Sequence, residues 1–368
     1  MSAGTVSVEF EKMARFIVDT FIGLGVPEAD ARICADVLIS ADKSGMFSHG
    51  VNRLKPIYYD RIRQGVQKPV TEIEIVRRGP TTAVIDGHDG MGMVIGKRSM
   101  EIAIENAEKY GMGMTVVRNS THYGIAGYYA RIACGRDMIG ITGTNARPSV
   151  APTFSTENML GTNPLTFGIP TDEEFPFVLD CATSIGQRGK IEAYEKLGKK
   201  VPAGWVVGYD GEAWTDPARI LNGLKAGDCA LAPLGGIGEE GAGYKGYGYS
   251  TVVEILSSAL QAGSFLKMLS GSTGGEPSPA RLGHFFIAID VSAFIDPVEF
   301  KRRTGDILRQ LRKAKKQPGQ GRIYTAGEKE NIAWTRDGDR GVSINPRLQQ
   351  DILCIQEELG LHGYDFPF

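Results

Sequence analysis

The sequence predicts a mixed α/β fold, and three observations support this prediction. Short apolar runs such as 112–117 and 138–144 have the length and composition of buried strands. Amphipathic stretches such as 95–110 alternate with these runs and predict helices. Glycine accounts for 48 of the 368 residues, nearly twice the usual share of roughly 7%. Because the glycines cluster between the apolar runs, they indicate tight turns around a ligand.

Composition and charge exclude several classes of protein. Hydrophobic residues make up 42% of the chain, charged residues 23%, and the formal net charge is −2. No basic stripe is present, so we expect no nucleic-acid partner. No signal-peptide pattern and no run of 18 apolar residues is found, so we expect a cytoplasmic protein without a membrane partner. The five cysteines include no Cys-x-x-Cys pair, which predicts neither a metal site nor a disulfide framework.

The N-terminal segment is predicted to form three helices. The stretch 7–24 has helical apolar periodicity and ends at paired glycines. Pro27 suits the first turn of a second helix, which ends near Gly45, and 58–62 continues as a third.

Ser48, His49 and Arg53 form a polar motif between the second and third helices. If Arg53 is helical, His49 four residues earlier can point the same way. A fixed cation beside a titratable group is a clamp for a carboxylate. Ser48 could cap the helix or orient His49. The alternative is a capping Ser-His pair with a surface arginine.

The rest of the chain alternates between apolar strands and periodic helices, with glycine or proline at most junctions. The predicted strands are 70–76, 82–85, 112–117, 138–144, 165–169, 177–179 and 284–289. The predicted helices are 95–110, 128–134, 188–196, 251–262, 297–311 and 346–359. The segment 202–222 is expected to be loop and edge structure, and 324–330 a turn.

His122 is the first candidate for chemistry. It follows the predicted strand 112–117 and precedes small residues that open a helix, the position where α/β enzymes often place reactive groups. The free N–H groups of such a helix attract anions. A buried histidine hydrogen-bonded at a strand end is the alternative. Asp180 likewise ends a strand, and Arg147, in a loop with two prolines, is a candidate anion contact.

The stretch 233–248 is the richest in glycine, and its backbone N–H groups could face phosphates with Lys245 as a point charge. It is not a P-loop, because Gly246 stands where Ser or Thr is required, and no GxGxxG opens a βαβ unit. A surface loop is the alternative.

Together these motifs resemble the type-2 malate/L-lactate dehydrogenase family over nearly the whole chain. The shared motifs are SHGVNRL at 48–54, THYGIAGYYA at 121–130, the 145–152 loop, LGTNPLTFGIPT at 160–171, LDCATS at 179–184, GYKGYG at 243–248 and GHFFIAID at 283–290. The resemblance implies a non-Rossmann NAD(P)-binding domain with a mixed sheet at 76–294. It also implies a helical domain built from both chain ends, 1–75 and 295–368, and a homodimer.

The resemblance implies roles for individual residues as well. His122 is the acid/base group, Ser48 and His49 form a charge relay or bind substrate, and Arg53 contacts the substrate carboxylate. We add Asp180 as a catalytic positioning group, and Thr162 and Arg147 as further substrate contacts. The expected cofactor contacts are His122, Tyr123, Gly124, Ile125, Ala126, Ala146, Asp180, Cys181, Ala182, Lys245, Ala326, Gly327 and Glu328.

The expected reaction is the reversible reduction of a 2-oxo acid to an L-2-hydroxy acid with NAD or NADP, and malate/oxaloacetate is the preferred pair. The alternatives within the family are L-lactate, sulfolactate or ureidoglycolate dehydrogenases and a cyclic-imine reductase. Outside it stand a Ser/Cys-His hydrolase using Ser48 or Cys181, which no GxSxG motif supports, and a nucleotide-binding protein without catalysis.

Overall fold

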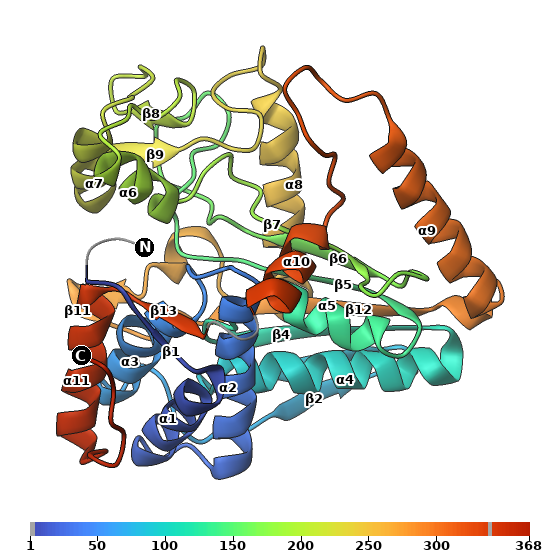
Figure 1. Cartoon of the computed structure of the whole chain (residues 1–368), viewed down its shortest axis with the longest axis horizontal. Coiled ribbons are helices and arrows are strands. Elements are labelled where there is room, and N and C mark those ends of the chain that lie inside the picture. The colour runs from blue at the N-terminus through green and yellow to red at the C-terminus, as the bar shows by residue number, and fades with distance from the viewer. Residues whose placement is uncertain (1–3, 338–340) are drawn as a thin grey trace.

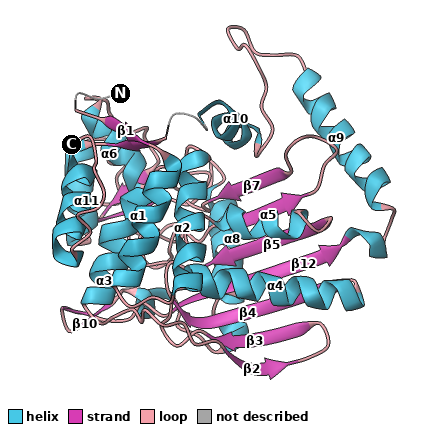
Figure 2. Ribbon diagram, turned by 60° about the horizontal axis from the view of Figure 1, so that its bottom comes forward, coloured by secondary structure: helices cyan, strands magenta, loops and turns pink. Residues whose placement is uncertain are grey.

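The computed structural model describes residues 4–337 and 341–368 (Figure 1). Its centre is a mixed seven-stranded sheet, in which only β3 and β4 run parallel to each other. In spatial order the strands are β2 (Glu74–Arg78), β3 (Thr82–Asp86), β4 (Met112–Ser120), β12 (Leu282–Asp290), β5 (Met138–Thr144), β6 (Leu165–Ile169) and β7 (Phe177–Cys181). Figure 2 shows this order from β2 at the bottom to β7 at the top. The prediction of a mixed α/β fold is confirmed.

The two faces of the sheet are covered differently. α4 (Gly92–Tyr110) and α5 (Ala126–Cys134) pack on one face, where Val117, Tyr129 and Phe286 are fully buried (Figure 2). On the other face α8 (Gly243–Leu256) contributes Val253 to a small cluster with Val116 and Phe285. Alternate residues of a strand point to opposite faces, which is why neighbours such as Val116 and Val117 join different clusters.

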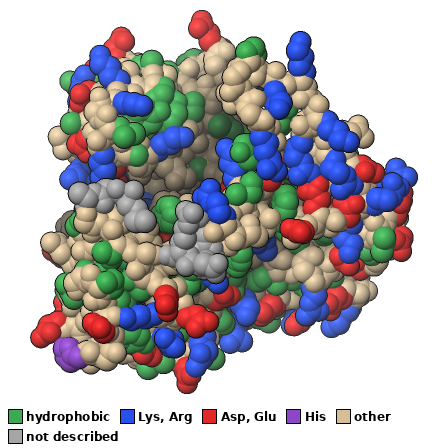
Figure 3. Space-filling model, viewed as in Figure 1, with side chains coloured by type: hydrophobic (Ala, Val, Ile, Leu, Met, Phe, Trp, Pro, Cys, Tyr) green, Lys and Arg blue, Asp and Glu red, His purple; other side chains and the backbone are tan. Residues whose placement is uncertain are grey.

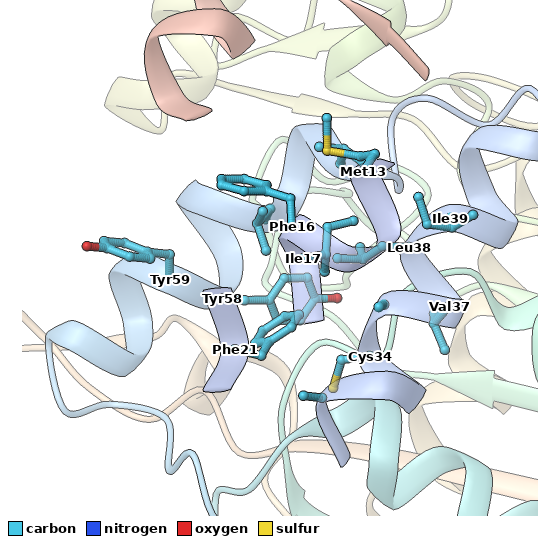
Figure 4. Packing of buried hydrophobic residues seen from close by; sticks show 14 of the residues in the cluster. Met13, Phe16, Ile17, Phe21, Cys34, Val37, Leu38, Ile39, Tyr58 and Tyr59 are labelled. Carbon is cyan, nitrogen blue, oxygen red and sulfur yellow. The ribbon is translucent and has the colours of Figure 1, made fainter. Parts of the chain in front are cut away.

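A helical layer joins the two ends of the chain. It holds β1 (Val6–Val8), α1 (Phe10–Gly23), α2 (Glu28–Lys43), the helical run η1 (Val51–Arg53), η2 (Leu54–Tyr59) and α3 (Asp60–Arg63), β13 (Val342–Ile344) and α11 (Pro346–Leu359). β1 pairs with β13 in antiparallel fashion. Figure 4 shows Phe16, Phe21, Leu38 and Tyr58 packed between these helices. η2 is a π-helix, a wider turn that is often found at functional sites.

A small lobe lies between β7 and α8, with its own apolar core around Trp214 and Ile220. It contains α6 (Arg188–Lys196), β8 (Val206–Gly208), α7 (Pro217–Ala226) and β9 (Cys229–Leu231). The other short elements are η3 (Ala259–Gln261), η4 (Leu266–Leu269), β10 (Ser272–Thr273), β11 (Glu276–Pro277) and η5 (Val291–Ala293).

α9 (Pro297–Lys313) lies along one edge of the molecule, and α10 (Glu328–Asp337) near the centre of the view (Figure 1). Arg309 and Arg312 of α9 pair with Asp172 and Glu173 in the loop after β6. No described helix combines the length and apolarity that a bilayer crossing requires. The division into the domains 1–75 with 295–368 and 76–294 stays a prediction.

Several predicted elements are wrong in part. The segment 202–222 is not only loop, because α7 begins at Pro217, where Asp216 accepts the Arg219 N–H and caps the helix. Residues 6–8 form a strand, β2 begins only at Glu74, and α10 begins within the expected turn.

The glycine-rich stretch is the clearest correction. Residues 243–248 are the first turns of α8, not a loop, although glycine disfavours helices. A side chain at Gly243 or Gly246 would collide with the carbonyl oxygens of Gly236 and Leu234. Close backbone packing therefore requires glycine here and outweighs its low helix propensity.

Candidate active site

A cavity of about 450 Å³ lies between the helical layer, the sheet and the small lobe. Figure 3 shows the molecule hollowed near its centre, below the lobe that carries α6 and α7. We call this cavity the central cavity. Its lining residues are Met46, Ser48, His49, Gly124, Ile125, Ala126, Thr162, Pro164, Asp180, Cys181, Ala182, Ser184, Ile185, Gly186, Gln187, Lys190 and Leu234. Predicted substrate and cofactor contacts thus meet around one cavity.

His122 lies two residues beyond the end of β4. A second histidine fixes this end of the sheet: His284 Nε2 lies 2.8 Å from Ser120 Oγ, and His284 Nδ1 lies 2.7 Å from Thr144 Oγ1. His284 is fully buried, and burial lowers its pKa to about 3, so it is a neutral structural group. Because His284 bonds to the last residue of β4 and to the last residue of β5, the loops that follow these two strands begin next to each other.

Two groups hold Nδ1 of His122. The Tyr58 hydroxyl lies 2.7 Å from it, and the Gly124 N–H donates to it across 3.3 Å. Among the described residues Nε2 has no hydrogen-bond partner, so it is the ring nitrogen left for a substrate. Gly124 has a φ of +80°, and a Cβ there would collide with Val37, so only glycine suits this position.

His49 stacks on His122, with ring centroids 5.8 Å apart and an angle of 21° between the planes. The Ser48 hydroxyl lies 2.9 Å from His49 Nδ1, and Arg53 Nε donates to the Ser48 carbonyl. The predicted proximity of Ser48, His49 and Arg53 is therefore present. Arg53 does not itself line the central cavity, but its positive charge lowers the pKa of His49, which does.

The surroundings of the two histidines favour their neutral forms. Burial, followed by the positive charge of Arg53, lowers the pKa of His49 to about 4. Burial is also the largest cause that lowers the pKa of His122 well below 6.5, and His49, Arg61 and Arg53 act in the same direction. A buried cation is disfavoured both by lost hydration and by nearby like charges. A bound anion would offset the repulsion from the nearby positive charges and so raise the pKa of the histidines again.

Asp180 ends β7 and caps α5. Its carboxylate accepts the Gly127 N–H at 2.6 Å and the Thr166 hydroxyl at 3.1 Å. These bonds attach the first turn of α5 to the sheet beside the central cavity. Burial is the largest influence on its pKa and raises it above the usual value.

The remaining predicted cofactor contacts are placed in three ways. Ala146 packs on the turn that contains Thr162, because its carbonyl approaches Gly161 and its N–H bonds to Asn163. Lys245 lies in the first turn of α8, next to Leu234 of the cavity wall. The segment 326–328 lies along β7, where the Val178 N–H reaches the Ala326 carbonyl.

Two of the predicted contacts point elsewhere. Tyr123 points away from the central cavity and stacks on His284 at 4.5 Å. Glu328 is 1% exposed, and its carboxylate is held by Arg322 and by the Thr325 N–H. Neither side chain is available to a molecule in the central cavity.

Sequence reasoning missed three residues of the site. Tyr58 and Arg61 lie in the segment read only as a third helix, and Asp42 lies at the end of α2. Asp42 is buried and accepts the Val51 N–H at 2.8 Å, which holds the start of the helical run. Asp42 follows Leu38 and Ile39 by four and three residues, which puts a carboxylate on the apolar face of the helix, and this was the available signal for its role.

The hydrolase alternative finds little support in this geometry. Burial raises the pKa of the Cys181 thiol, so a reactive thiolate is disfavoured. Among the described residues no carboxylate hydrogen-bonds to His49, which a charge relay based on Ser48 would require. Within residues 4–337 and 341–368 no group of three or more Cys, His, Asp or Glu side chains is placed to hold a metal ion.

Comparison with known proteins gives one consistent result. The family model described as malate/L-lactate dehydrogenase matches residues 8–353. A malate dehydrogenase of Pyrococcus horikoshii is 40% identical over 358 residues, 97% of each chain. An L-sulfolactate dehydrogenase of Methanocaldococcus jannaschii is 38% identical, over 97% of this chain and 98% of the relative. The crystal structure of malate dehydrogenase from Entamoeba histolytica superposes with a TM-score of 0.93 at 43% identity and covers 99% of this chain and 100% of that one.

Proposed function

Because the chain belongs to the malate/L-lactate dehydrogenase family, we propose that it interconverts L-malate and oxaloacetate with a nicotinamide cofactor. The observation that carries this proposal is the setting of His122. Tyr58 and Gly124 hold Nδ1, while Nε2 remains for a substrate beside the central cavity. The named malate dehydrogenases of P. horikoshii and E. histolytica support the choice of substrate.

The residues around the central cavity fit a nicotinamide dinucleotide. Gly124 and Ala126 at the start of α5 let a ligand approach the backbone closely, and Ile125, Ile185 and Leu234 offer apolar surface to a ring. Members of the family use NAD(P). We propose that Ile125, Ala126, Asp180, Cys181 and Ala182 hold the nicotinamide end. A bound NAD(P)H would supply the hydride that the carbonyl carbon of the substrate accepts.

His122 supplies the proton. In the reducing direction protonated His122 donates from Nε2 to the oxygen that develops negative charge as the C–H bond forms. In the oxidising direction the neutral ring takes this proton back. The Tyr58 hydroxyl can donate to Nδ1 or accept from it, so it keeps its bond to His122 in both states.

Arg53 and His49 orient the 2-oxo acid. We propose that Arg53 attracts the carboxylate next to the carbonyl group and that His49, stacked on His122, donates a hydrogen bond to it. Fixing one end of a small substrate sets the carbonyl within reach of both the hydride and the proton donor.

We also propose that the chain forms a homodimer. Apolar side chains on α8 and just beyond it are about half exposed: Val252 48%, Ile255 51% and Leu260 54%. Exposed apolar side chains on neighbouring helical turns are typical of an interface. Sedimentation of the protein would test this, and Ile255→Asp should shift it toward the monomer. A monomer at micromolar concentration would contradict the proposal.

The direct test is a panel of initial rates with NADH and NADPH. Oxaloacetate, pyruvate, sulfopyruvate and a cyclic imine carboxylate should be compared at equal concentration. We expect oxaloacetate to give the highest kcat/KM with one of the two cofactors. The L-sulfolactate dehydrogenase relative makes sulfopyruvate the second candidate. Absence of turnover with all four substrates would refute the proposed function.

A further inference from the structure

We infer that Arg61 and Arg147 form a second anion subsite beside His122, so that the substrate carries an anionic group at both ends. This inference rests on the proposed function and names the side chains that would select its substrate. It adds Arg61 to the site and separates dicarboxylic from monocarboxylic 2-oxo acids. A pair formed by a carboxylate and a sulfonate would satisfy the same chemistry.

Arg61 is directed to the site by the helical run that carries Tyr58. Residues three positions apart lie on the same face of a helix, and Tyr58 directs its hydroxyl to His122. Arg61 is half-buried, and its charge reaches both Tyr58 and His122. The Arg61 guanidinium therefore lies near the proton donor.

Arg147 reaches the same region from the sheet. It lies three residues after Thr144, and His284 joins Thr144 to Ser120, two residues before His122. The start of the loop that leads from Thr144 to Arg147 is held in place, because the Asn145 side chain bonds to the backbone of Gly283 and Ser264. The side chain of Arg147 is exposed, and its positive charge opposes that of Arg61.

Neither guanidinium has a counter-charge within the part of the chain that the structure describes. No ion pair or side-chain hydrogen bond involves Arg61 or Arg147 there, whereas Arg302, Arg309 and Arg312 are all paired with carboxylates. Two like charges held near each other without an acid are unfavourable. A bound anion removes this repulsion and can take two forked hydrogen bonds from each guanidinium.

The two proposed anion subsites lie on either side of the proton donor along the helical run. Arg53 precedes Tyr58 by five residues, about one turn of the π-helix, and Arg61 follows it by three. A four-carbon dicarboxylate has its second carboxylate two bonds beyond the carbonyl carbon. Such a molecule could place one carboxylate at Arg53 and the other at Arg61, with the carbonyl oxygen at His122.

The test compares oxaloacetate with pyruvate, which has the same carbonyl group but no second anion. We expect wild type to prefer oxaloacetate in kcat/KM. Arg61→Gln and, separately, Arg147→Gln should lower the oxaloacetate-to-pyruvate ratio by about 10- to 100-fold, the range of one charged hydrogen bond. The pyruvate value should fall much less. Arg61→Lys should keep more of the preference than Arg61→Gln.

Arg63→Gln is the matched control, since Arg63 belongs to the same helix but reaches toward Glu358 on the surface. It should leave the ratio unchanged. Arg147 is exposed, so its variant should fold even if Arg61→Gln does not. Sulfopyruvate replaces oxaloacetate in a second arm, and a larger kcat/KM that falls in the same variants would identify the second group as a sulfonate.

Two failures are distinguishable. An enzyme that reduces no 2-oxo acid with either cofactor refutes the proposed function. An enzyme that reduces oxaloacetate and keeps its preference over pyruvate in both variants overturns the second anion subsite alone. A wild-type preference for pyruvate contradicts both the subsite and the choice of malate/oxaloacetate as the substrate pair.

Discussion

The Tyr58 hydroxyl lies 2.7 Å from Nδ1 of His122, although 64 residues separate the two in the chain. Tyr58 comes from the helical layer and His122 from the end of a central strand. This bond therefore joins the two parts of the fold at the point where we propose that a proton is transferred.

Replacing His122 with alanine should lower turnover by about two to four decades, because the general acid and base is lost. Binding of NADH, followed by its fluorescence, should survive. His88→Ala is the control, since His88 is a surface residue whose ring bonds to Glu74. Turnover of the His122 variant near the wild-type rate would remove this residue from the mechanism.

Tyr58→Phe should lower kcat by about 10- to 100-fold with a smaller change in KM, because it removes one hydrogen bond to an imidazole that becomes charged. The aromatic ring and its edge contact with Phe21 remain, so stability should change little. Rates measured in H2O and in D2O would report whether the proton step has become limiting. An unchanged kcat would show that Gly124 alone orients the ring.

Arg53→Ala should act mainly on KM for the 2-oxo acid, raising it by about 10- to 100-fold. The affinity for NADH should stay close to that of the wild type, because Arg53 bonds to the Ser48 carbonyl and does not line the cavity at the proposed nicotinamide end. Saturation curves for oxaloacetate would measure this. A KM equal to that of wild type would place the carboxylate clamp elsewhere.

The two directions of the reaction should depend differently on pH above neutrality. Burial and nearby positive charges lower the pKa of His122 well below 6.5, so the free protein holds the neutral ring at pH 7. Malate oxidation needs this form and should show a constant kcat/KM from neutral pH upward. Oxaloacetate reduction needs the protonated ring, and its kcat/KM should fall about tenfold per pH unit in the same range.

The variant Arg61→Gln extends the pH prediction. It removes one of the positive charges that lower the pKa of His122, so the acid limb of malate oxidation should move to higher pH. Profiles of Arg61→Gln and the wild type in matched buffers would show the shift. An acid limb that moves to lower pH would contradict the assigned electrostatics.

Asp42 should make stability depend on pH. Burial raises its pKa from 3.8 to about 7 in the folded protein. Between these values the folded state binds the proton more tightly than the unfolded state does, so stability should fall with rising pH by about 1.4 kcal/mol per unit from this group. Asp42→Asn keeps an acceptor for the Val51 N–H and removes the effect. Its melting temperature should match wild type near pH 4 and exceed it at pH 8.

Much of the fold could be predicted because its strands and helices have clear apolar periodicity. β5, β6, α6 and α11 begin and end as predicted. α7 could also have been found, since Asp216 and Pro217 form a regular helix start. β1 and β13 could not, because each is a three-residue strand that exists only through pairing between the chain ends.

The residues of the candidate site likewise fall into those that the sequence predicted and those that it missed. The histidines, Arg53 and Asp180 stand in recognisable local patterns, and the structure brings Ser48, His49 and Asp180 to one cavity. Tyr58 and Arg61 were missed because their roles depend on a contact across 64 residues that no local pattern records. The family resemblance placed Tyr123 at the cofactor, yet its ring packs inward on His284.

The π-helix at Leu54–Tyr59 sets a fixed angular relation between the side chains before and after it. Deleting a single residue there would rotate everything upstream by about 100° relative to everything downstream, the step of one residue in an α-helix. Arg53 and Arg61 could then no longer face the same imidazole. The number of residues in this turn therefore fixes the relative direction of the two side chains. Insertion or deletion of one residue here should reduce activity far more than point substitutions in the surrounding loops.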